Sequence, residues 1–206
     1  MIEHARYYPH DAYTCMPWRN GAGITREIAR APVQGEGFAW RLSLASLRAS
    51  GPFSSYAGYQ RCVALVDGRG FRLNVAGAEA KTLSVRGEHT LFSGAAEASC
   101  ELLDGPCTDL SLMVHDPGTI DSVVRLDLSA EHRMCAPLGK LQALFVLNGA
   151  VSCRTLEPSG PDASSAPPYR LNFNDTLLIH GRGAFWSIGP GAGEIGELLV
   201  VTFAPP

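Results

Sequence analysis

The chain has 206 residues, of which 46% are hydrophobic, and a formal net charge of −3 at pH 7. This length allows one large domain or two small ones, with enough hydrophobic residues to bury a core. The weak negative charge gives no electrostatic reason to expect nucleic acid or an anionic membrane as a partner.

Targeting and redox features point to the cytoplasm. No apolar run approaches the ~18 residues that a membrane helix needs, and the segment MIEHARYYPH lacks the apolar region of a signal peptide. The six cysteines form no CxxC pair and no Cys/His cluster typical of zinc sites. We expect buried free thiols in a reducing cytosol, with a disulfide in a secreted protein as the alternative.

The first distinctive segment, residues 16–28, has the sequence MPWRNGAGITREI. Its two glycines disfavour a helix and allow close approach of the backbone to another group. Trp18 and Asn20 add a large aromatic surface and an amide that both donates and accepts. We predict a shaped loop leading into a strand over residues 25–30. From these residues alone, a surface turn and a functional loop are equally compatible.

Short strands are predicted along the rest of the first half, because glycine and proline recur between short apolar runs. In residues 38–47, Trp40, Leu42 and Leu44 alternate with Arg41, Ser43 and Ala45. Asp67-Gly68 is a tight-hairpin signal, and residues 116–118 form a plausible boundary. The predicted strands cover residues 38–47, 61–67, 71–75, 81–85, 89–92, 98–103 and 109–115.

The second half repeats the first in three places. Residues 63–68 match 144–149, residues 90–94 match 177–181, and residues 110–114 match 198–202. Two copies of one β-unit are the economical explanation. We therefore predict an all-β bicupin, with two cupin-like (jelly-roll) barrels over residues 1–118 and 119–206. A single β-sandwich is the alternative fold, and low-complexity residues 157–168 are predicted to form a mobile insertion in the second barrel.

Motifs for common catalytic chemistry are absent from the sequence. The six histidines are isolated and no HxH occurs, which argues against a metal site built from paired imidazoles. There is no GxSxG motif, no cysteine with a nearby histidine, and no GK[ST] after the glycine-rich segments. We therefore expect no metal, no cofactor and no catalytic nucleophile.

Polar residues on inward-facing positions are the remaining candidates. Arg41 and Ser43 alternate with apolar residues on one strand, and Asp109 and Ser111 do so on another. A buried arginine needs a carboxylate or an anionic ligand. Arg41 could pair with Asp109, or Arg41 or Arg61 could bind a ligand carboxylate. The ligand interpretation is favoured because small polar donors accompany the arginines.

The segments WRNGAGITREIA, FAWRLSLAS, GPFSSYAGYQR and DLSLM resemble motifs of the HutD/Ves family. The resemblance covers about residues 15–115, and the second half is matched only by its position and β-character. Ser111 stands where the family usually has asparagine. The residues that match the family pattern are Trp18, Asn20, Gly21, Gly23, Thr25, Glu27, Trp40, Arg41, Ser43, Ala45, Gly51, Pro52, Phe53, Ser54, Gly58, Arg61, Asp109 and Met113.

The resemblance implies a cytoplasmic bicupin associated with histidine utilisation. It implies a regulatory protein without established catalysis that binds a small anionic metabolite, such as N-formylated glutamate or urocanate. The residues predicted to bind this ligand in the N-terminal barrel are Trp18, Asn20, Gly21, Gly23, Thr25, Arg41, Ser43, Phe53, Ser54, Arg61 and Asp109.

Two other functions stay open at this point. One is a metal-independent isomerase or epimerase of a small polar metabolite, with His89, Asp109 or Glu27 as the general base. The other is a structural or dimerising bicupin in which Arg41 and Asp109 form a buried pair. The sequence leaves a homodimer open and locates no interface for it.

Overall fold

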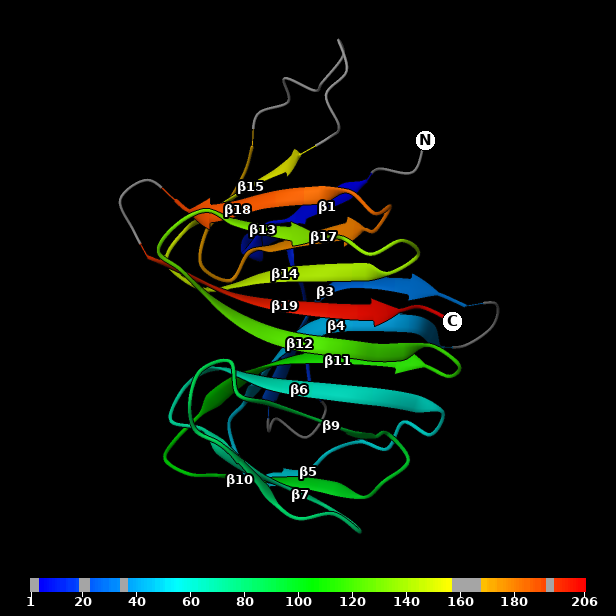
Figure 1. Ribbon diagram of the computed structural model, residues 1–206. Coiled ribbons are helices and arrows are strands. Elements are labelled where there is room, and N and C mark those ends of the chain that lie inside the picture. The colour runs from blue at the N-terminus through cyan, green and yellow to red at the C-terminus, as the bar shows by residue number, and fades with distance from the viewer. Residues whose placement is uncertain (1–3, 19–22, 34–36, 157–167, 192–194) are drawn as a thin grey trace. The chain divides into compact units, whose positions relative to one another are not determined.

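The computed structural model describes residues 4–18, 23–33, 37–156, 168–191 and 195–206 (Figure 1). Strands dominate these residues, and the helical element that they contain is the short 3-10 turn η1 (His10–Ala12). Within this part of the chain, no helix has the length and apolarity needed to cross a membrane. The predicted insertion falls almost wholly on residues 157–167, which lie outside the described residues.

Contacts divide the chain into two compact units. We call Tyr13–Ile120 with Pro205–Pro206 the N-terminal unit, and Asp121–Ala204 with Met1–Ala12 the C-terminal unit. The predicted division assigned residues 1–118 to the first barrel, whereas the first twelve residues belong to the C-terminal unit. Strand β1 (Ala5–Tyr8) pairs antiparallel with β17 (Thr176–His180), and this pairing covers a strand edge that would otherwise be open.

The N-terminal unit contains two hydrogen-bonded sheets. The six-stranded sheet has the order β2-β3-β4-β11-β6-β9, and the four-stranded sheet has the order β5-β10-β7-β8. The strands are β2 (Thr14–Pro17), β3 (Gly23–Pro32), β4 (Phe38–Leu47), β5 (Gly51–Pro52), β6 (Tyr59–Asp67), β7 (Phe71–Val75), β8 (Lys81–Leu83), β9 (His89–Ser93), β10 (Ala98–Leu102) and β11 (Cys107–His115).

One hydrophobic cluster draws on both sheets of the N-terminal unit. Its buried members are Leu47, Val63, Leu65, Phe71, Leu73, Leu83, Cys100 and Cys107. On β4, β6 and β11 most inward positions beyond this cluster carry polar side chains, with Ala45 and Met113 as the apolar ones. The apolar core therefore fills only part of the space between the sheets, which leaves room for the cavity described below.

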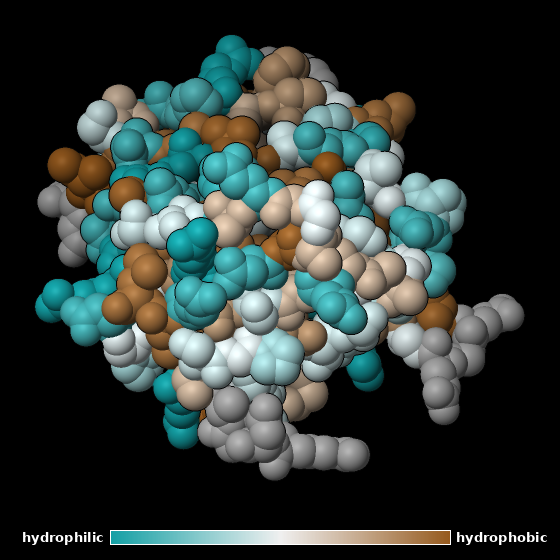
Figure 2. Space-filling model, turned by 90° about the horizontal axis from the view of Figure 1, so that it is seen from below, coloured by the Kyte–Doolittle hydropathy of each residue, from teal (hydrophilic) through white to brown (hydrophobic). Residues whose placement is uncertain are grey.

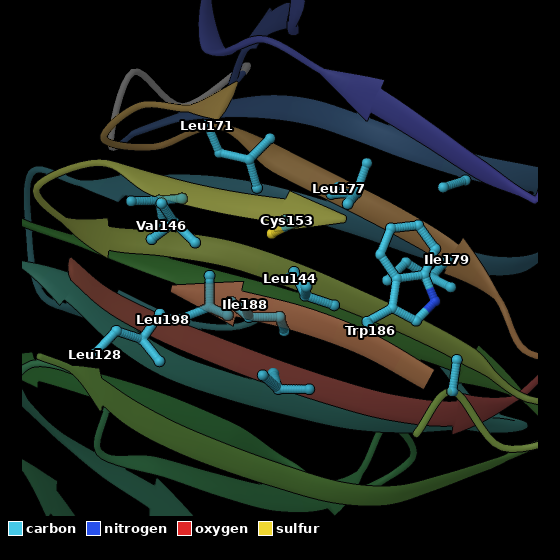
Figure 3. Close-up of a cluster of buried hydrophobic side chains, with 14 residues drawn as sticks. Leu128, Leu144, Val146, Cys153, Leu171, Leu177, Ile179, Trp186, Ile188 and Leu198 are labelled. Carbon is cyan, nitrogen blue, oxygen red and sulfur yellow. The ribbon is translucent and has the colours of Figure 1, made fainter. Parts of the chain in front are cut away.

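The C-terminal unit repeats this arrangement. Its sheets have the orders β1-β17-β14-β19-β12 and β13-β18-β15-β16. Their remaining strands are β12 (Thr119–Leu128), β13 (His132–Cys135), β14 (Leu141–Asn148), β15 (Val151–Leu156), β16 (Tyr169–Leu171), β18 (Phe185–Pro190) and β19 (Gly196–Ala204). Figure 3 shows apolar side chains from both sheets, among them Leu144, Leu198 and Trp186, converging on one interior.

The strand orders confirm the internal repeat predicted from the sequence. The matched segments lie on β9, β6 and β11 in one unit and on β17, β14 and β19 in the other, and each trio is hydrogen-bonded in that order. The smaller sheets also correspond, since β10-β7-β8 is matched by β18-β15-β16. Each unit is a jelly-roll of two separately hydrogen-bonded sheets, and not one continuously bonded barrel.

Several predicted strands have the observed boundaries, and others differ at their ends. The predictions for β4 and β7 are correct at both ends, whereas β11 begins two residues earlier than predicted. The strand predicted over residues 81–85 ends at Leu83. It ends there because the Glu88 carboxylate accepts hydrogen bonds from the backbone N–H groups of Ser84 and Val85, which fixes a turn.

All six cysteines are free, as predicted, and four of them are buried. Burial raises the pKa of Cys62 and Cys153 to about 12, so these thiols stay protonated and unreactive at neutral pH. Cys15 and Cys135 are exposed, contrary to the general expectation of buried thiols.

On the face shown in Figure 2, hydrophobic residues form small groups among hydrophilic ones, as is usual for protein surfaces.

Asp175 ties β1 and η1 to the rest of the C-terminal unit. Its carboxylate accepts hydrogen bonds from the Tyr7 hydroxyl at 2.7 Å, the His10 N–H at 2.8 Å and the Asn172 N–H at 2.8 Å.

We expect Asp175→Ala to lower the free energy of unfolding by about 3 kcal/mol, because three donors lose a charged acceptor. Urea denaturation measures this loss. Asp127→Ala, which breaks an exposed ion pair with Arg125, is the matched control and should cost at most about 1 kcal/mol.

Candidate functional site

A cavity of about 520 Å³ lies within the N-terminal unit. It is lined by the inward faces of β3, β4, β6 and β11, by the segment around β2, and by the segment that follows β5. Its lining residues are Met16, Pro17, Trp18, Thr25, Arg41, Ser43, Ala45, Pro52, Phe53, Ser54, Tyr56, Arg61, Asp109, Ser111 and Met113.

Strand register arranges the polar lining in rows, where a row is a set of residues opposite one another on adjacent strands. Strand β11 lies between β4 and β6, and its Met113 is opposite both Arg41 and Arg61. The next inward residue of β11, Ser111, is opposite Ser43. Asp109 follows two residues further along the strand. The two arginines therefore share one row, while Asp109 lies two rows away from them on the same face.

Arg61 is almost fully buried, with 3% of its surface exposed. Its guanidinium donates a hydrogen bond from Nη1 to the Ser54 carbonyl at 3.0 Å. The guanidinium carbon lies 4.9 Å from the centroid of the Phe92 ring and 5.1 Å from that of Phe53. Burial lowers the pKa of Arg61, and the attraction of Asp109 acts in the opposite direction. Aromatic faces thus hold this cation where most of its hydration is lost.

Arg41 is held in a similar way. Its guanidinium carbon lies 4.8 Å from the Phe38 ring centroid and 5.4 Å from that of Tyr56. The Tyr56 ring also lies 5.6 Å from the guanidinium carbon of Arg61, so one tyrosine contacts both cations. The polar contacts of Arg41 are long, with Nη2 at 3.5 Å from the Tyr56 hydroxyl and 3.7 Å from the Met113 sulfur.

Several buried polar atoms in this cavity lack a partner. Within the described residues, Nε of Arg41, Nε of Arg61 and Oγ of Ser111 make no hydrogen bond. Buried polar groups in folded proteins are normally paired. These three side chains, which line the cavity, thus carry buried polar atoms without a partner in this part of the chain.

Asp109 is the most unusual group in the cavity. It has no exposed surface, and neither carboxylate oxygen accepts a hydrogen bond from the described residues. Burial raises the pKa of Asp109 to about 7, and the attraction of Arg61 opposes the rise only in part. The carboxyl group is therefore partly protonated at neutral pH.

The buried pair that we considered between Arg41 and Asp109 does not form in the described residues. The ion pairs of this part of the chain do not include it. The register explains why, because Arg41 is opposite Met113 and Asp109 is opposite Ala45. Alternation placed both side chains on the same face, but they occupy different rows.

Trp18, which precedes β3, and Thr25, near the start of β3, form one wall of the cavity. The indole Nε1 of Trp18 donates a hydrogen bond to the Thr25 hydroxyl at 2.8 Å. Gly23 lies behind this indole, where an added Cβ would meet Trp18 at 2.8 Å and the Ser46 carbonyl oxygen at 2.5 Å. Gly23 is therefore required for close packing and does not itself line the cavity. Asn20 and Gly21 lie outside the described residues.

The structure brings most of the predicted site residues together. Trp18, Thr25, Arg41, Ser43, Phe53, Ser54, Arg61 and Asp109 all line the cavity. The site predicted from the sequence did not include Tyr56 and Met113, and Ser111 was predicted only as part of a polar face. An aromatic residue within the otherwise small and polar segment SSYAG was the available signal for Tyr56.

The three candidate bases differ in position. Asp109 lines the cavity, whereas Glu27 and His89 do not. Glu27 forms an ion pair with Arg30 at 3.4 Å, and His89 Nδ1 lies 3.3 Å from the Gly87 carbonyl oxygen. Among the described residues, no group of three or more histidine, cysteine, aspartate or glutamate side chains is placed to hold a metal ion.

Comparison with known protein families shows which family this chain belongs to. The HutD family model matches residues 10–193. The chain belongs to the HutD family. Protein Ves of Cronobacter sakazakii is 32% identical over 173 residues, which cover 84% of this chain and 81% of that protein. The family resemblance noted in the first-half motifs is thereby confirmed.

Another relative and two solved structures extend this result. A 21.2 kDa protein encoded in the hutC 3′ region of Pseudomonas putida is 44% identical over 102 residues, covering 49% of this chain and 53% of that protein. A conserved protein of unknown function from Pseudomonas aeruginosa PAO1 has a TM-score of 0.82 at 31% identity, covering 98% of this chain and 99% of that chain. HutD from Pseudomonas fluorescens SBW25, solved in a formate condition, has a TM-score of 0.75 at 27% identity with the same coverage.

More distant structures show the fold alone. An oxalate decarboxylase from Lactobacillus farciminis has a TM-score of 0.67 at 9% identity, covering 97% of this chain and 86% of that chain. Together with the strand orders, this likeness confirms the predicted all-β bicupin fold. Some matches are partial, since the aligned segment spans about half the length of the P. putida relative.

We expect Gly23→Ala to destabilise the N-terminal unit by about 1–3 kcal/mol, because the added methyl group must displace Trp18 or the Ser46 backbone. Gly51→Ala is the matched control, since a Cβ there meets no atom within 4 Å. Urea denaturation of both variants tests the packing, and equal stabilities would show that Trp18 moves freely.

We expect Asp109→Asn to remove a pH dependence of stability. Between about pH 4 and pH 7 the folded protein keeps a proton on Asp109 that the unfolded chain has lost, so the carboxyl makes stability fall as pH rises. At pH 8 the variant should therefore be more stable than the parent by up to about 4 kcal/mol. Near pH 3 the two should be alike. Urea denaturation across this range measures the difference, and parallel curves would contradict the raised pKa.

Proposed function

We propose that this protein is a non-catalytic binding protein for a small carboxylate metabolite, with a regulatory role in histidine utilisation. The observation that carries the proposal is the pair of guanidinium groups of Arg61, which is buried, and Arg41, which is half-buried. Both side chains line one cavity and keep unpaired Nε donors. Guanidinium groups match the planar geometry of carboxylates. A bound carboxylate would supply the countercharge that the described residues give these cations only through Asp109.

The size and lining of the cavity support a small ligand. A volume of about 520 Å³ suits a metabolite. Phe53 and Trp18 provide apolar walls, and Ser43, Ser54 and Thr25 provide polar groups around them. A molecule of the size of N-formylglutamate or urocanate, with one or two carboxylates and a short body, fits this combination of groups.

The link to histidine utilisation is supported by the family and its relatives. The chain belongs to the HutD family, and its P. putida relative is encoded in the hutC 3′ region. A regulatory role follows from binding without turnover, because a protein that senses a pathway intermediate needs a specific pocket and no chemistry. Six free thiols suit the reducing cytoplasm, where we propose that the protein acts.

A second candidate function is a metal-independent isomerase or epimerase. The observation that favours it is the position of Asp109 in the cavity together with its pKa of about 7. A carboxylate that titrates near neutral pH suits a general base. Proton NMR of N-formylglutamate in deuterated buffer tests this function, because an epimerase would exchange the proton next to the carboxylate.

We expect calorimetric titration to detect binding of N-formylglutamate, urocanate or both to the parent protein. Arg61→Gln should weaken this binding by about tenfold to a hundredfold, because a buried charge-assisted hydrogen bond is lost. Arg72→Gln on β7 is the matched control, since this arginine is exposed and lies outside the cavity lining. It should leave the affinity unchanged.

Two results would contradict the proposal. One is the absence of heat with glutamate, formate, N-formylglutamate and urocanate when circular dichroism shows folded protein. The other is equal weakening by Arg61→Gln and Arg72→Gln, which would place binding at the surface.

A further inference from the structure

The carboxylate of Asp109 is not explained by the binding of an anion. A negative group inside a pocket for negative ligands opposes binding when it is ionised. It also has no hydrogen-bond partner, because neither oxygen accepts a hydrogen bond from the described residues. Its surface is fully buried, yet it belongs to the lining of the cavity. The group therefore calls for a partner supplied from within the cavity.

The rows of the sheet give this partner a position. Met113, Ser111 and Asp109 alternate along the inward face of β11, at about 7 Å per pair of residues. The arginines flank Met113, so the cavity has a cationic end and an acceptor end, with Ser111 between them. Arg61 lies close enough to Asp109 for their charges to attract each other, which limits the gap that a ligand must bridge. A molecule of a few bonds in length can thus contact both ends.

We propose that the ligand carries an N–H or O–H donor a few atoms from its carboxylate, and that Asp109 accepts this donor while Arg41 and Arg61 hold the carboxylate. This inference rests on the proposed carboxylate-binding function and narrows its ligand class. The class comprises amino acids, N-acyl amino acids and acids with a heterocyclic N–H. Simple dicarboxylates fall outside it, because their second carboxylate would face Asp109.

The C-terminal unit shows that the fold does not need a carboxylate at this position. Asp109 of β11 is opposite Leu65 of β6, and in the repeated unit Leu198 of β19 is opposite Val146 of β14. Both pairs adjoin a shift in strand register, so Leu198 corresponds to Asp109, one residue off the sequence match of 110–114 with 198–202. Leu198 and Val146 are both members of the buried cluster there. An apolar residue thus satisfies the same place in the strand order. Asp109 is therefore a feature of the cavity, and not of the scaffold.

A matched pair of probes tests the donor directly. The first is N-formylglutamate, and the second is its ester analogue, in which an oxygen atom replaces the N–H group. We expect the parent protein to bind the amide at least about tenfold more tightly, since a hydrogen bond to a buried carboxylate is lost with the ester. Calorimetric titration of both compounds measures this ratio.

The variant Asp109→Leu tests whether Asp109 is the acceptor. Leucine is chosen because Leu198 occupies the corresponding position of β19. The preference for the amide should fall to within about twofold, while affinity for the ester stays the same or rises. Asp109→Asn keeps an acceptor oxygen and should retain part of the preference. Circular dichroism confirms that both variants fold, and the comparison of the two probes on the parent protein needs no variant.

Each outcome decides between the two proposals. Equal affinity of the parent for amide and ester overturns the donor inference and leaves carboxylate binding intact. A preference that persists in Asp109→Leu also overturns it, because another group would then be the acceptor. Failure of the parent to bind the glutamate derivatives, glutarate and urocanate overturns both proposals together.

Discussion

Arg41, Arg61 and Asp109 lose most of their contact with water inside the N-terminal unit, and the described residues compensate them incompletely. The two cations rest on aromatic rings and on one short hydrogen bond to a backbone carbonyl. The carboxylate receives only the attraction of Arg61. Burying charge without full pairing costs stability. The remaining strands and apolar core must supply the stability that keeps this arrangement in place.

The two units show how one strand order serves two purposes. In the C-terminal unit the inward positions of β14 and β19 carry Leu144, Val146, Leu198 and Val200, which fill the interior (Figure 3). In the N-terminal unit, β6 carries the apolar Val63 and Leu65, but its other inward residue is Arg61, and β11 carries Asp109 and Ser111 inward. The filled unit is a packed scaffold, and the unit with the incomplete core contains the cavity.

Side-chain alternation made much of this predictable from the sequence. It placed Arg41, Ser43, Asp109 and Ser111 on inward faces, and the internal matches revealed the repeated unit. The pairing of β1 with β17 was not predictable, because Ala5–Tyr8 carries no signal for its distant partner. The Arg41–Asp109 pair was wrong because alternation gives the face of a residue but not its row. The role of Tyr56 depends on two arginines brought together only by the fold.

Incomplete pairing also links the stability of the unit to its occupant. A ligand that pairs with the arginines and Asp109 binds only the folded state. Once its concentration exceeds the dissociation constant, the free energy of unfolding rises with the logarithm of the ratio of the two. The charged residues of the site lie on three adjacent strands, β4, β11 and β6. Occupancy therefore stabilises the centre of the sheet itself. Under the proposed regulatory role, the concentration of the ligand would thus set the stability of the N-terminal unit.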